Sequence, residues 1–378
     1  MHRHPPVSGH RGRRYGPPLW RGPARRGRVT VLAAGLFGLI ALAGCSLDRA
    51  ASPPAQTGPR PAERQAVTVP VIVIPGMLGS RLADRTTGRT AWPSIAAALP
   101  IPALMSRLAL PLTGAAATRN AAAGTPGGSL VPDGLIRRIA WFDFYDGLIR
   151  QLELERGPCV APHEIQPGST CVLLAWDWRR DLVEAAVALD EAIAALRRVH
   201  AAPELKVDVV AHSAGALVVR YYERFGGTDV LDSEAVAEAP MTGAAALRRV
   251  VQLAPPNNGS IYGLQRVMRG ERMGLSWLNP EVMTTMPSIY QLLPHPDRES
   301  MIGIDGAPIN VDLYDIDNWR RFQEAIFRPQ AQARIAARFP DPQKRAAYAS
   351  RLEQQFVRGL ARGARFHRAL DAPRRPSS

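Results

Sequence analysis

Ser213 lies in the pentapeptide Ala211–Gly215 (AHSAG), between the apolar run Val207–Val210 and the amphipathic stretch Ala216–Phe225. A serine on a sharp strand-to-helix turn exposes its hydroxyl for nucleophilic attack. The residues two positions away must be small, because larger side chains would meet neighbouring backbone. The helix that follows directs its N-terminal amides at the serine, where they stabilise a developing oxyanion. The pattern predicts that Ser213 is the nucleophile of an acyl-transfer site, with Ala211 in place of the motif's first glycine.

A second segment can supply the other half of an oxyanion site. The apolar run Pro70–Ile74 ends in the turn Pro75–Leu78. A carbonyl oxygen that becomes anionic is stabilised by backbone amides aimed at it. In proteins with this serine turn, one amide belongs to the residue after the nucleophile and the other to an earlier loop that follows a strand. We therefore expect the amides of Leu78 and Ala214 to form the oxyanion hole.

Four short β-branched runs alternate with alanine- and leucine-rich helical stretches. The runs are Val67–Ile74, Val172–Trp176, Val207–Val210 and Val250–Leu253. This alternation predicts a mostly parallel sheet with helices on both faces. Together with the serine turn, it predicts an α/β-hydrolase fold.

The domain organisation follows from where that alternation holds. We expect the α/β-hydrolase core at residues 67–265, interrupted at 84–140 by an apolar, proline-punctuated insertion that packs as core or as a lid. Residues 266–378 are poor in strand patterns and rich in arginine and helical patterns. They are predicted to form a helical cap and C-terminal tail.

Five motifs, in this order, resemble the family of lecithin:cholesterol acyltransferase and phospholipid:diacylglycerol acyltransferase with their bacterial relatives. They are VIPGMLGSRL, AWDWRR, AHSAG, LAPPNNGS and MPSIYQLLP, and the resemblance covers about residues 68–295. It implies an acyl-ester hydrolase or acyltransferase that acts on lipids. It also implies Ser213 as nucleophile, Leu78 and Ala214 as oxyanion amides, and a structural or substrate-positioning role for Asp177–Arg179.

A serine nucleophile needs a histidine base and a carboxylate that orients it, and in this fold they follow the serine in the order acid, then histidine. His295 directly follows the last family motif, too soon to come after an acid-bearing strand. His367 is therefore the candidate base, although Phe356–Leu370 around it has a helical pattern. Ile309–Asp315 alternates like a strand and ends in acids, but the resemblance places it largely in the cap. The acid remains unassigned.

In the family, the acid and the histidine come on two further strands beyond the cap. Nothing after Trp319 has a strand pattern. We therefore expect a truncated or frameshifted gene product, or a degenerate enzyme. Losing two strands would leave one sheet edge unpaired, which favours aggregation unless the helical tail covers that edge.

The N-terminus has the organisation of an export signal. An arginine-rich arm precedes the uncharged apolar run Val29–Gly44, whose sixteen residues are short for a membrane span. Cys45 directly follows Leu-Ala-Gly, which resembles a bacterial lipobox, in which the cysteine is lipidated. We predict a signal peptide at 1–44, a lipidated Cys45 and a proline-rich tether at 45–66, holding the protein at a membrane on the periplasmic or outer side. An ordinary signal peptide and an uncleaved anchor are the alternatives.

Cys159 and Cys171 flank an eleven-residue loop rich in turn-forming residues. In an oxidising compartment, a disulfide bond is the expected state of such a pair. A metal site that uses both cysteines with His163 is the alternative, but the spacing matches no zinc pattern. We expect neither a metal nor a cofactor.

The formal net charge of +14 does not indicate a nucleic-acid partner. Eight arginines lie within residues 1–44, and removing that segment leaves a charge of +6. No basic run is interleaved with stacking aromatic residues, as single-strand binding requires.

The sequence therefore favours a membrane-attached, serine-dependent lipid acyl-ester hydrolase or O-acyltransferase. Its expected partners are a lipid acyl ester and a membrane surface. The alternative is a catalytically inactive lipoprotein that keeps the fold as a lipid-binding or structural module. A peptidase on the same scaffold is a weaker third interpretation.

Overall fold

The computed structural model describes residues 68–93, 105–112, 129–139, 141–232, 236–273, 276–299, 301–303, 305–309 and 311–375. By its contacts, the part of the chain from Gln56 to Ser378 forms one compact unit, and it contains all of these residues. The predicted signal peptide, the lipidated Cys45 and the tether lie outside the described residues.

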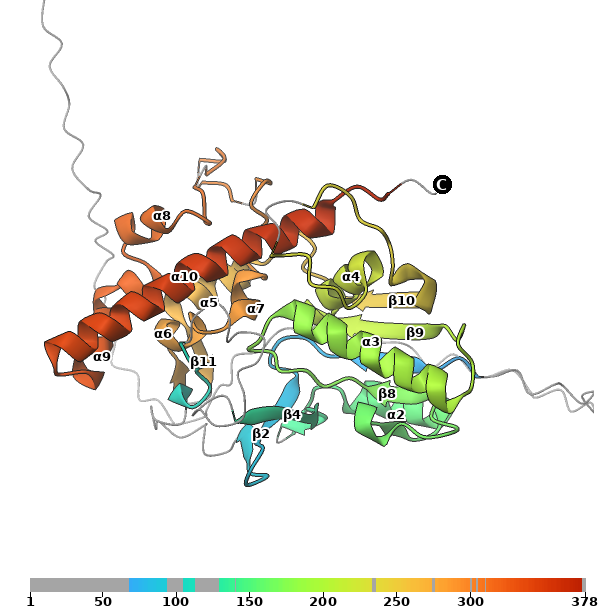
Figure 1. Cartoon of the computed structure of the whole chain (residues 1–378). Coiled ribbons are helices and arrows are strands. Elements are labelled where there is room, and N and C mark those ends of the chain that lie inside the picture. Colours follow the sequence, from blue (N-terminus) through green and yellow to red (C-terminus); the bar gives the residue numbers. More distant parts are fainter. Residues whose placement is uncertain are drawn as a thin grey trace, which may run out of the picture. The chain divides into compact units, whose positions relative to one another are not determined.

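A parallel sheet of five strands forms the centre of this unit (Figure 1). In spatial order the strands are β10 (Leu247–Leu253), β9 (Val207–His212), β1 (Val71–Ile74), β8 (Cys171–Leu173) and β7 (Cys159–Val160). Each of the four predicted runs contributes one strand, and the predicted α/β-hydrolase fold with its mostly parallel sheet is confirmed. Because the strands run parallel, their carboxyl ends meet at one edge of the sheet, where Ile74 is paired with Ala211 and His212 with Leu253.

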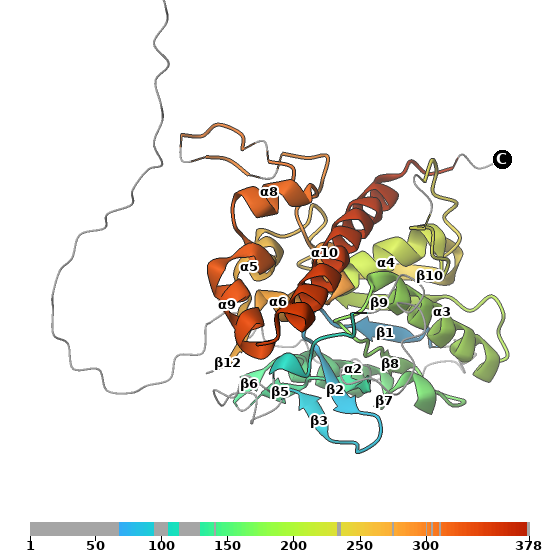
Figure 2. The same ribbon diagram turned by 60° about the vertical axis from the view of Figure 1, so that its left-hand side comes forward.

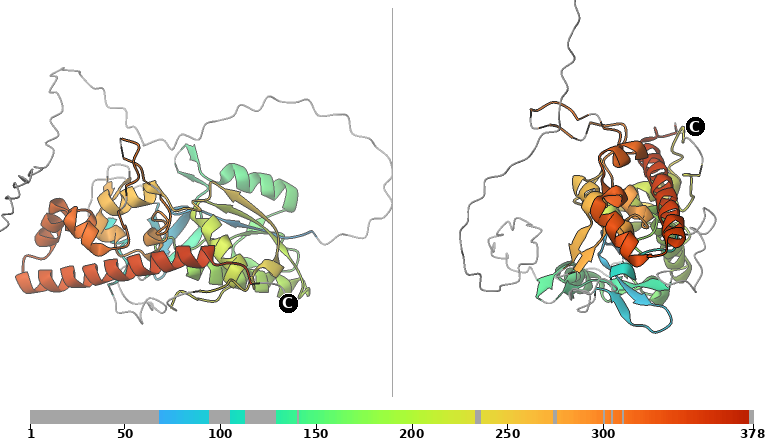
Figure 3. Two further views of the ribbon diagram at one scale, coloured as in Figure 1. Left: turned by 90° about the horizontal axis from the view of Figure 1, so that it is seen from above. Right: turned by 90° about the vertical axis from the view of Figure 1, so that its left-hand side faces the viewer.

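Helices cover both faces of the sheet. Side chains alternate between the faces of a strand, so Ile72 and Ile74 share one face of β1 and Val73 lies on the other. The first face packs in the main core with α3 (Leu182–Val199) and α4 (Ala214–Phe225). Val73 packs in a separate cluster with α2 (Asp146–Arg156). Figure 3 shows α2 on one side of the strands and α3 and α4 on the other.

A small antiparallel sheet follows β1 in the chain. It has the order β3 (Thr90–Trp92), β2 (Ser80–Asp84) and β4 (Leu130–Leu135), and it leads into the hairpin of β5 (Arg138–Ile139) and β6 (Phe142–Asp143). The predicted insertion at 84–140 is thus described only in part. Within it, Met105 and Leu108 are buried in the main core.

The chain from Ile261 onward is mostly helical. Its elements are α5 (Ile261–Arg269), β11 (Glu271–Met273), β12 (Ser276–Leu278), α6 (Pro280–Met283), α7 (Pro287–Tyr290), α8 (Ile316–Arg321), α9 (Pro329–Arg338) and α10 (Pro342–Asp371). The alternation in Ile309–Asp315 does not produce a strand in the described residues 311–315. Instead, the Asp315 carboxylate accepts a hydrogen bond from the Asp317 amide and caps α8.

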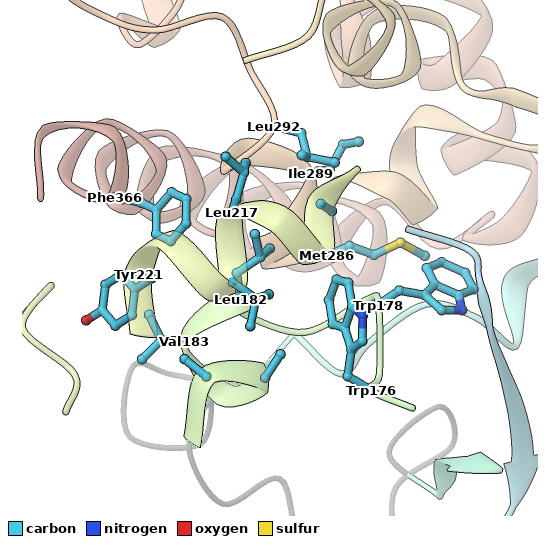
Figure 4. Packing of buried hydrophobic residues seen from close by; sticks show 14 of the residues in the cluster. Trp176, Trp178, Leu182, Val183, Leu217, Tyr221, Met286, Ile289, Leu292 and Phe366 are labelled. Atoms are coloured by element: carbon cyan, nitrogen blue, oxygen red, sulfur yellow. The ribbon is translucent and has the colours of Figure 1, made fainter. Parts of the chain in front are cut away.

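Helix α10 crosses the other cap helices and reaches α4 (Figures 1 and 2). Gly359 and Gly363 allow it to lie against Tyr290 of α7, since an added Cβ would come within 2.3 Å and 2.5 Å of that residue. Farther along, the Phe366 ring stacks on Tyr221 with centroids 5.7 Å apart, beside Leu217 in the packed core that Figure 4 shows. Arg362 pairs with Asp181 at the start of α3. These contacts fasten the cap to the hydrolase core.

Cys159 and Cys171 form a disulfide bond in the structure. They stand opposite each other on the neighbouring strands β7 and β8. The bond therefore closes the intervening loop at the end of the sheet opposite β10 in strand order.

Candidate active site

Ser213 occupies a strained turn between β9 and α4. Its backbone has φ 51° and ψ −121°, outside the ordinary regions for a residue with a side chain. The turn is held because the Ser213 amide donates to the Leu253 carbonyl at 2.8 Å. Such strain persists only where the surrounding structure enforces it, and it is concentrated at functional sites. This is the geometry that the pentapeptide predicts for a nucleophile.

The small residues of the turn are required by close backbone approach. A Cβ on Gly215 would lie 2.7 Å from the Ile74 carbonyl oxygen and 2.8 Å from that of Pro75. A Cβ on Gly76 would lie 2.9 Å from the Ser213 Cβ. Ala211 is fully buried in the sheet, where its methyl group fits and a longer side chain would have to displace the core. The turn after β1 and the serine turn thus contact each other directly.

The two predicted oxyanion residues lie on these two turns. Leu78 has a φ of 65°, which turns the backbone sharply after β1. Its carbonyl accepts from Trp92 Nε1 at 2.9 Å, and Gly79 donates its amide to Gly76 at 3.0 Å, so the turn is braced. Ala214 is the first residue of α4, and amides in the first turn of a helix have no acceptor within it. Leu78 and Ala214 therefore lie on two turns that contact each other.

Tyr145 belongs to this site, although no sequence motif indicates it. Its hydroxyl lies 2.8 Å from His212 Nδ1 and accepts a hydrogen bond from the Gly76 amide at 2.9 Å. Burial raises the pKa of Tyr145 to about 12, and burial lowers the pKa of His212. At neutral pH, the phenol is therefore protonated and donates to an uncharged imidazole. Tyr145 ties the two turns together.

Asp177 and Arg179 have a structural role in the described contacts. The Arg179 guanidinium is fully buried and binds both oxygens of Asp177, at 2.8 Å and 2.7 Å. Its Nη1 donates to the Leu108 carbonyl, and its Nη2, besides binding Asp177, also donates to the Leu130 carbonyl. The buried pair therefore fastens the insertion after β2 to the end of β8, next to the site.

His367, the candidate base, lies in α10 and is completely buried. Its ring packs against that of His295, with centroids 5.2 Å apart. Burial and the neighbouring His295 lower the pKa of His367 to about 4. His295 Nε2 in turn lies 3.1 Å from an Asp371 oxygen. The structure thus places His367 beside a second histidine that itself contacts a carboxylate, and no described contact joins His367 to Ser213.

The remaining histidines of the described ranges are engaged elsewhere. His200 Nε2 contacts the Ser169 carbonyl at 2.9 Å, and His163 lies in the loop closed by the disulfide bond. No carboxylate in these ranges has a described contact with Ser213 or His212. The structure therefore shows a strained serine turn in contact with the turn after β1. The roles of Ser213, Leu78 and Ala214, and the identity of the base and acid, stay predictions.

No helix in the described ranges is both long and apolar enough to cross a membrane. In the same ranges, no group of three histidine, cysteine, aspartate or glutamate side chains could hold a metal ion.

Comparisons with known proteins add little to this geometry. The chain matches no protein-family model and no curated protein. Nine chains of solved structures match it. One of them, from "The crystal structure of Tle4-Tli4 complex", has a TM-score of 0.46 and 15% sequence identity over 82% of this chain and 73% of its own. A match at this level of similarity does not identify the activity of this protein.

Proposed function

We propose that this protein is a serine-dependent acyl-ester hydrolase or O-acyltransferase that acts on lipids and is attached to a membrane through a lipidated Cys45. The observation that carries the proposal is the conformation of Ser213, held at a positive φ between β9 and α4 and directly against the turn at Gly76. A strained serine on a strand-to-helix turn, next to a second turn whose amides can face it, suits acyl transfer.

The reaction follows from that arrangement. The Ser213 hydroxyl attacks the ester carbonyl as a base takes its proton, and the carbonyl oxygen becomes an anion held by the amides of Leu78 and Ala214. Collapse of this intermediate breaks the ester bond, and the alcohol leaves with the proton. Water or a second alcohol then attacks the acyl-serine and releases an acid or a new ester. Water gives hydrolysis and an alcohol gives transfer.

A second candidate is a catalytically inactive lipoprotein that keeps the fold as a lipid-binding module. The burial of His367 favours it, because a base that is 0% exposed in a helix cannot meet a substrate without rearrangement. The two candidates differ in one measurable property, the reactivity of the Ser213 hydroxyl.

The test is covalent labelling with a fluorophosphonate probe, using the chain from residue 46 onward, which contains the whole compact unit. Ser213→Ala is the negative variant, and Ser350→Ala, at an exposed position of α10, is the matched control. We expect labelling of the parent chain and of Ser350→Ala, and none of Ser213→Ala. Labelling that is also lost in His367→Phe, with folding intact, would identify His367 as the base.

No labelling of a folded parent chain would overturn the enzymatic proposal and favour the binding module. If the parent chain is labelled, fresh protein that has not met the probe would be offered p-nitrophenyl esters of increasing acyl length with and without a long-chain alcohol. Formation of the new ester would identify a transferase, and release of free acid alone a hydrolase.

A further inference from the structure

Three exposed aromatic side chains lie on the hairpin of β5 and β6 and directly after it. Trp141, Phe142 and Phe144 are 77%, 39% and 50% exposed. The rings of Trp141 and Phe142 contact each other, with centroids 5.6 Å apart. Single exposed apolar residues are ordinary, whereas a contiguous aromatic patch marks a site of interaction. We call these three residues the aromatic patch.

The hairpin that carries the aromatic patch is firmly held. The Arg137 carbonyl accepts hydrogen bonds from the amides of Phe144, Tyr145 and Asp146, at 3.0–3.2 Å. The Arg137 guanidinium binds Asp146 at 2.8 Å and Glu153 at 3.0 Å, which fastens the hairpin to α2. The backbone that carries the aromatic rings is therefore held in place. Because of this, little backbone conformational entropy is lost when a partner buries the rings.

The aromatic patch adjoins the candidate active site. Phe144 directly precedes Tyr145, whose hydroxyl bonds the Gly76 amide and contacts His212 beside the nucleophile. Figure 2 shows β5 and β6 next to the small sheet that begins two residues after Leu78. The aromatic patch is thus one residue along the chain from a side chain that bonds both turns of the site.

The hairpin also has exposed arginine side chains beside it, which can bind the phosphate of a phospholipid headgroup. Arg138 and Arg150 lie 3.4 Å and 3.0 Å from the same carboxylate, that of Asp146. Both arginine side chains are more than half exposed, whereas Asp146 is nearly buried beneath them. The Asp143 carboxylate is occupied by the amides of Asp146 and Gly147. The hairpin therefore presents aromatic rings flanked by guanidinium groups.

We propose that the aromatic patch docks on a lipid surface that contains anionic phospholipids. Tryptophan and phenylalanine rings partition into the interface between headgroups and acyl chains, and arginine binds phosphate. Docking would hold Ser213 at the surface where its substrate resides. This last consequence rests on the proposed function, whereas the docking itself does not.

The test uses vesicles of phosphatidylcholine and phosphatidylglycerol in a 3:1 ratio and the chain from residue 46 onward, which lacks the predicted lipid. Binding is measured by co-sedimentation for the parent chain and for Trp141→Ala/Phe144→Ala. The matched control is Trp277→Ala/Phe322→Ala, which removes the same two residue types from exposed positions of the cap. We expect the patch variant to bind at least tenfold more weakly and the control to bind like the parent chain. Circular dichroism verifies that all three are folded.

Equal binding by parent and patch variant would overturn the proposal, as would absence of binding by the parent chain. A parent chain that is dimeric in sedimentation, with a patch variant that is monomeric, would show instead that the patch pairs two copies of the protein.

Vesicles of pure phosphatidylcholine test whether the arginines contribute by binding anionic lipid, and we expect weaker binding to these vesicles. Ser213→Ala must bind vesicles normally. A parent chain that binds vesicles but is not labelled by the fluorophosphonate would refute only the enzymatic proposal. A parent chain that is labelled but does not bind vesicles would refute only the docking.

Discussion

The hydroxyl of Tyr145 lies 2.8 Å from His212 Nδ1, so the aromatic hairpin is bonded to the residue that precedes the nucleophile. The Gly76 amide donates to the same oxygen at 2.9 Å. These partners are 67 and 69 positions from Tyr145 in the chain. One phenolic oxygen therefore joins the hairpin, the turn after β1 and the serine turn.

Removing that oxygen should weaken both the fold and the site. Tyr145→Phe leaves the buried Gly76 amide without its acceptor, and an unsatisfied buried donor costs about 1–3 kcal/mol. We expect the free energy of unfolding in urea to fall by that amount and the rate of fluorophosphonate labelling to fall with it. Tyr290→Phe, which loses a buried bond to the Thr284 carbonyl in the cap, is the control. It should lower stability and leave the labelling rate unchanged. Equal effects of the two variants on labelling would show that Tyr145 has no specific role at the site.

The serine turn could be predicted from the sequence, whereas the contacts and burial of His212 and His367 could not. A pentapeptide records the requirement for small residues around Ser213, although the backbone that Gly215 meets, at Ile74 and Pro75, is distant in the chain. The bond between Tyr145 and His212 depends on the path of a hairpin between them and leaves no pattern in the sequence. His367 was assigned by its order in the chain, which says nothing of its burial against His295. In Ile309–Asp315, the capping preference of Asp315 prevailed over strand alternation.

Gly215 should be intolerant of substitution. In Gly215→Ala the new methyl group would meet the carbonyl oxygens of Ile74 and Pro75 below 3 Å, and neither can move without distorting β1. Overpacking of this kind costs about 1–3 kcal/mol. We expect a lower midpoint in urea and loss of fluorophosphonate labelling. Gly147→Ala is the matched control, because its added Cβ meets only the end of the Asp143 side chain at 3.2 Å. It should leave labelling intact, and a stable, reactive Gly215→Ala would contradict the described turn.

His367 should make the protein less stable in mild acid. Its pKa is about 4 when folded, against 6.5 for the unconstrained side chain, so the unfolded chain binds more protons between these values. Stability is therefore full above about pH 6.5 and falls as the pH drops toward 4, by about 3 kcal/mol for a shift of this size. His367→Phe should flatten this part of the profile of unfolding free energy against pH. His200→Phe, at the end of α3, is the control and should retain the slope. An unchanged slope in His367→Phe would assign the titration to another group.

The disulfide bond should contribute to stability through the loop that it closes. Cys159 and Cys171 are separated by 12 positions. Closing a loop of this length lowers the entropy of the unfolded chain, which raises the free energy of unfolding by about 3 kcal/mol. We expect reduction with dithiothreitol to lower the urea midpoint of the parent chain accordingly. Cys159→Ala/Cys171→Ala should resemble the reduced chain and be insensitive to dithiothreitol. Identical midpoints before and after complete reduction would refute the prediction.

The outer strand of the sheet should drive self-association. Among the described strands, β10 stands at one end of the sheet order, and Val250, Val251 and Leu253 are 36–50% exposed. Because neighbouring residues of a strand point to opposite faces, both faces of β10 are uncovered at its edge, an arrangement that templates pairing with another chain. Arg248 and Arg249 oppose this only at the start of the strand. Val251→Lys should therefore reduce light scattering as protein concentration rises, whereas Val357→Lys, at an exposed position of α10, should not. If both variants scatter like the parent chain, the edge of β10 is protected in solution.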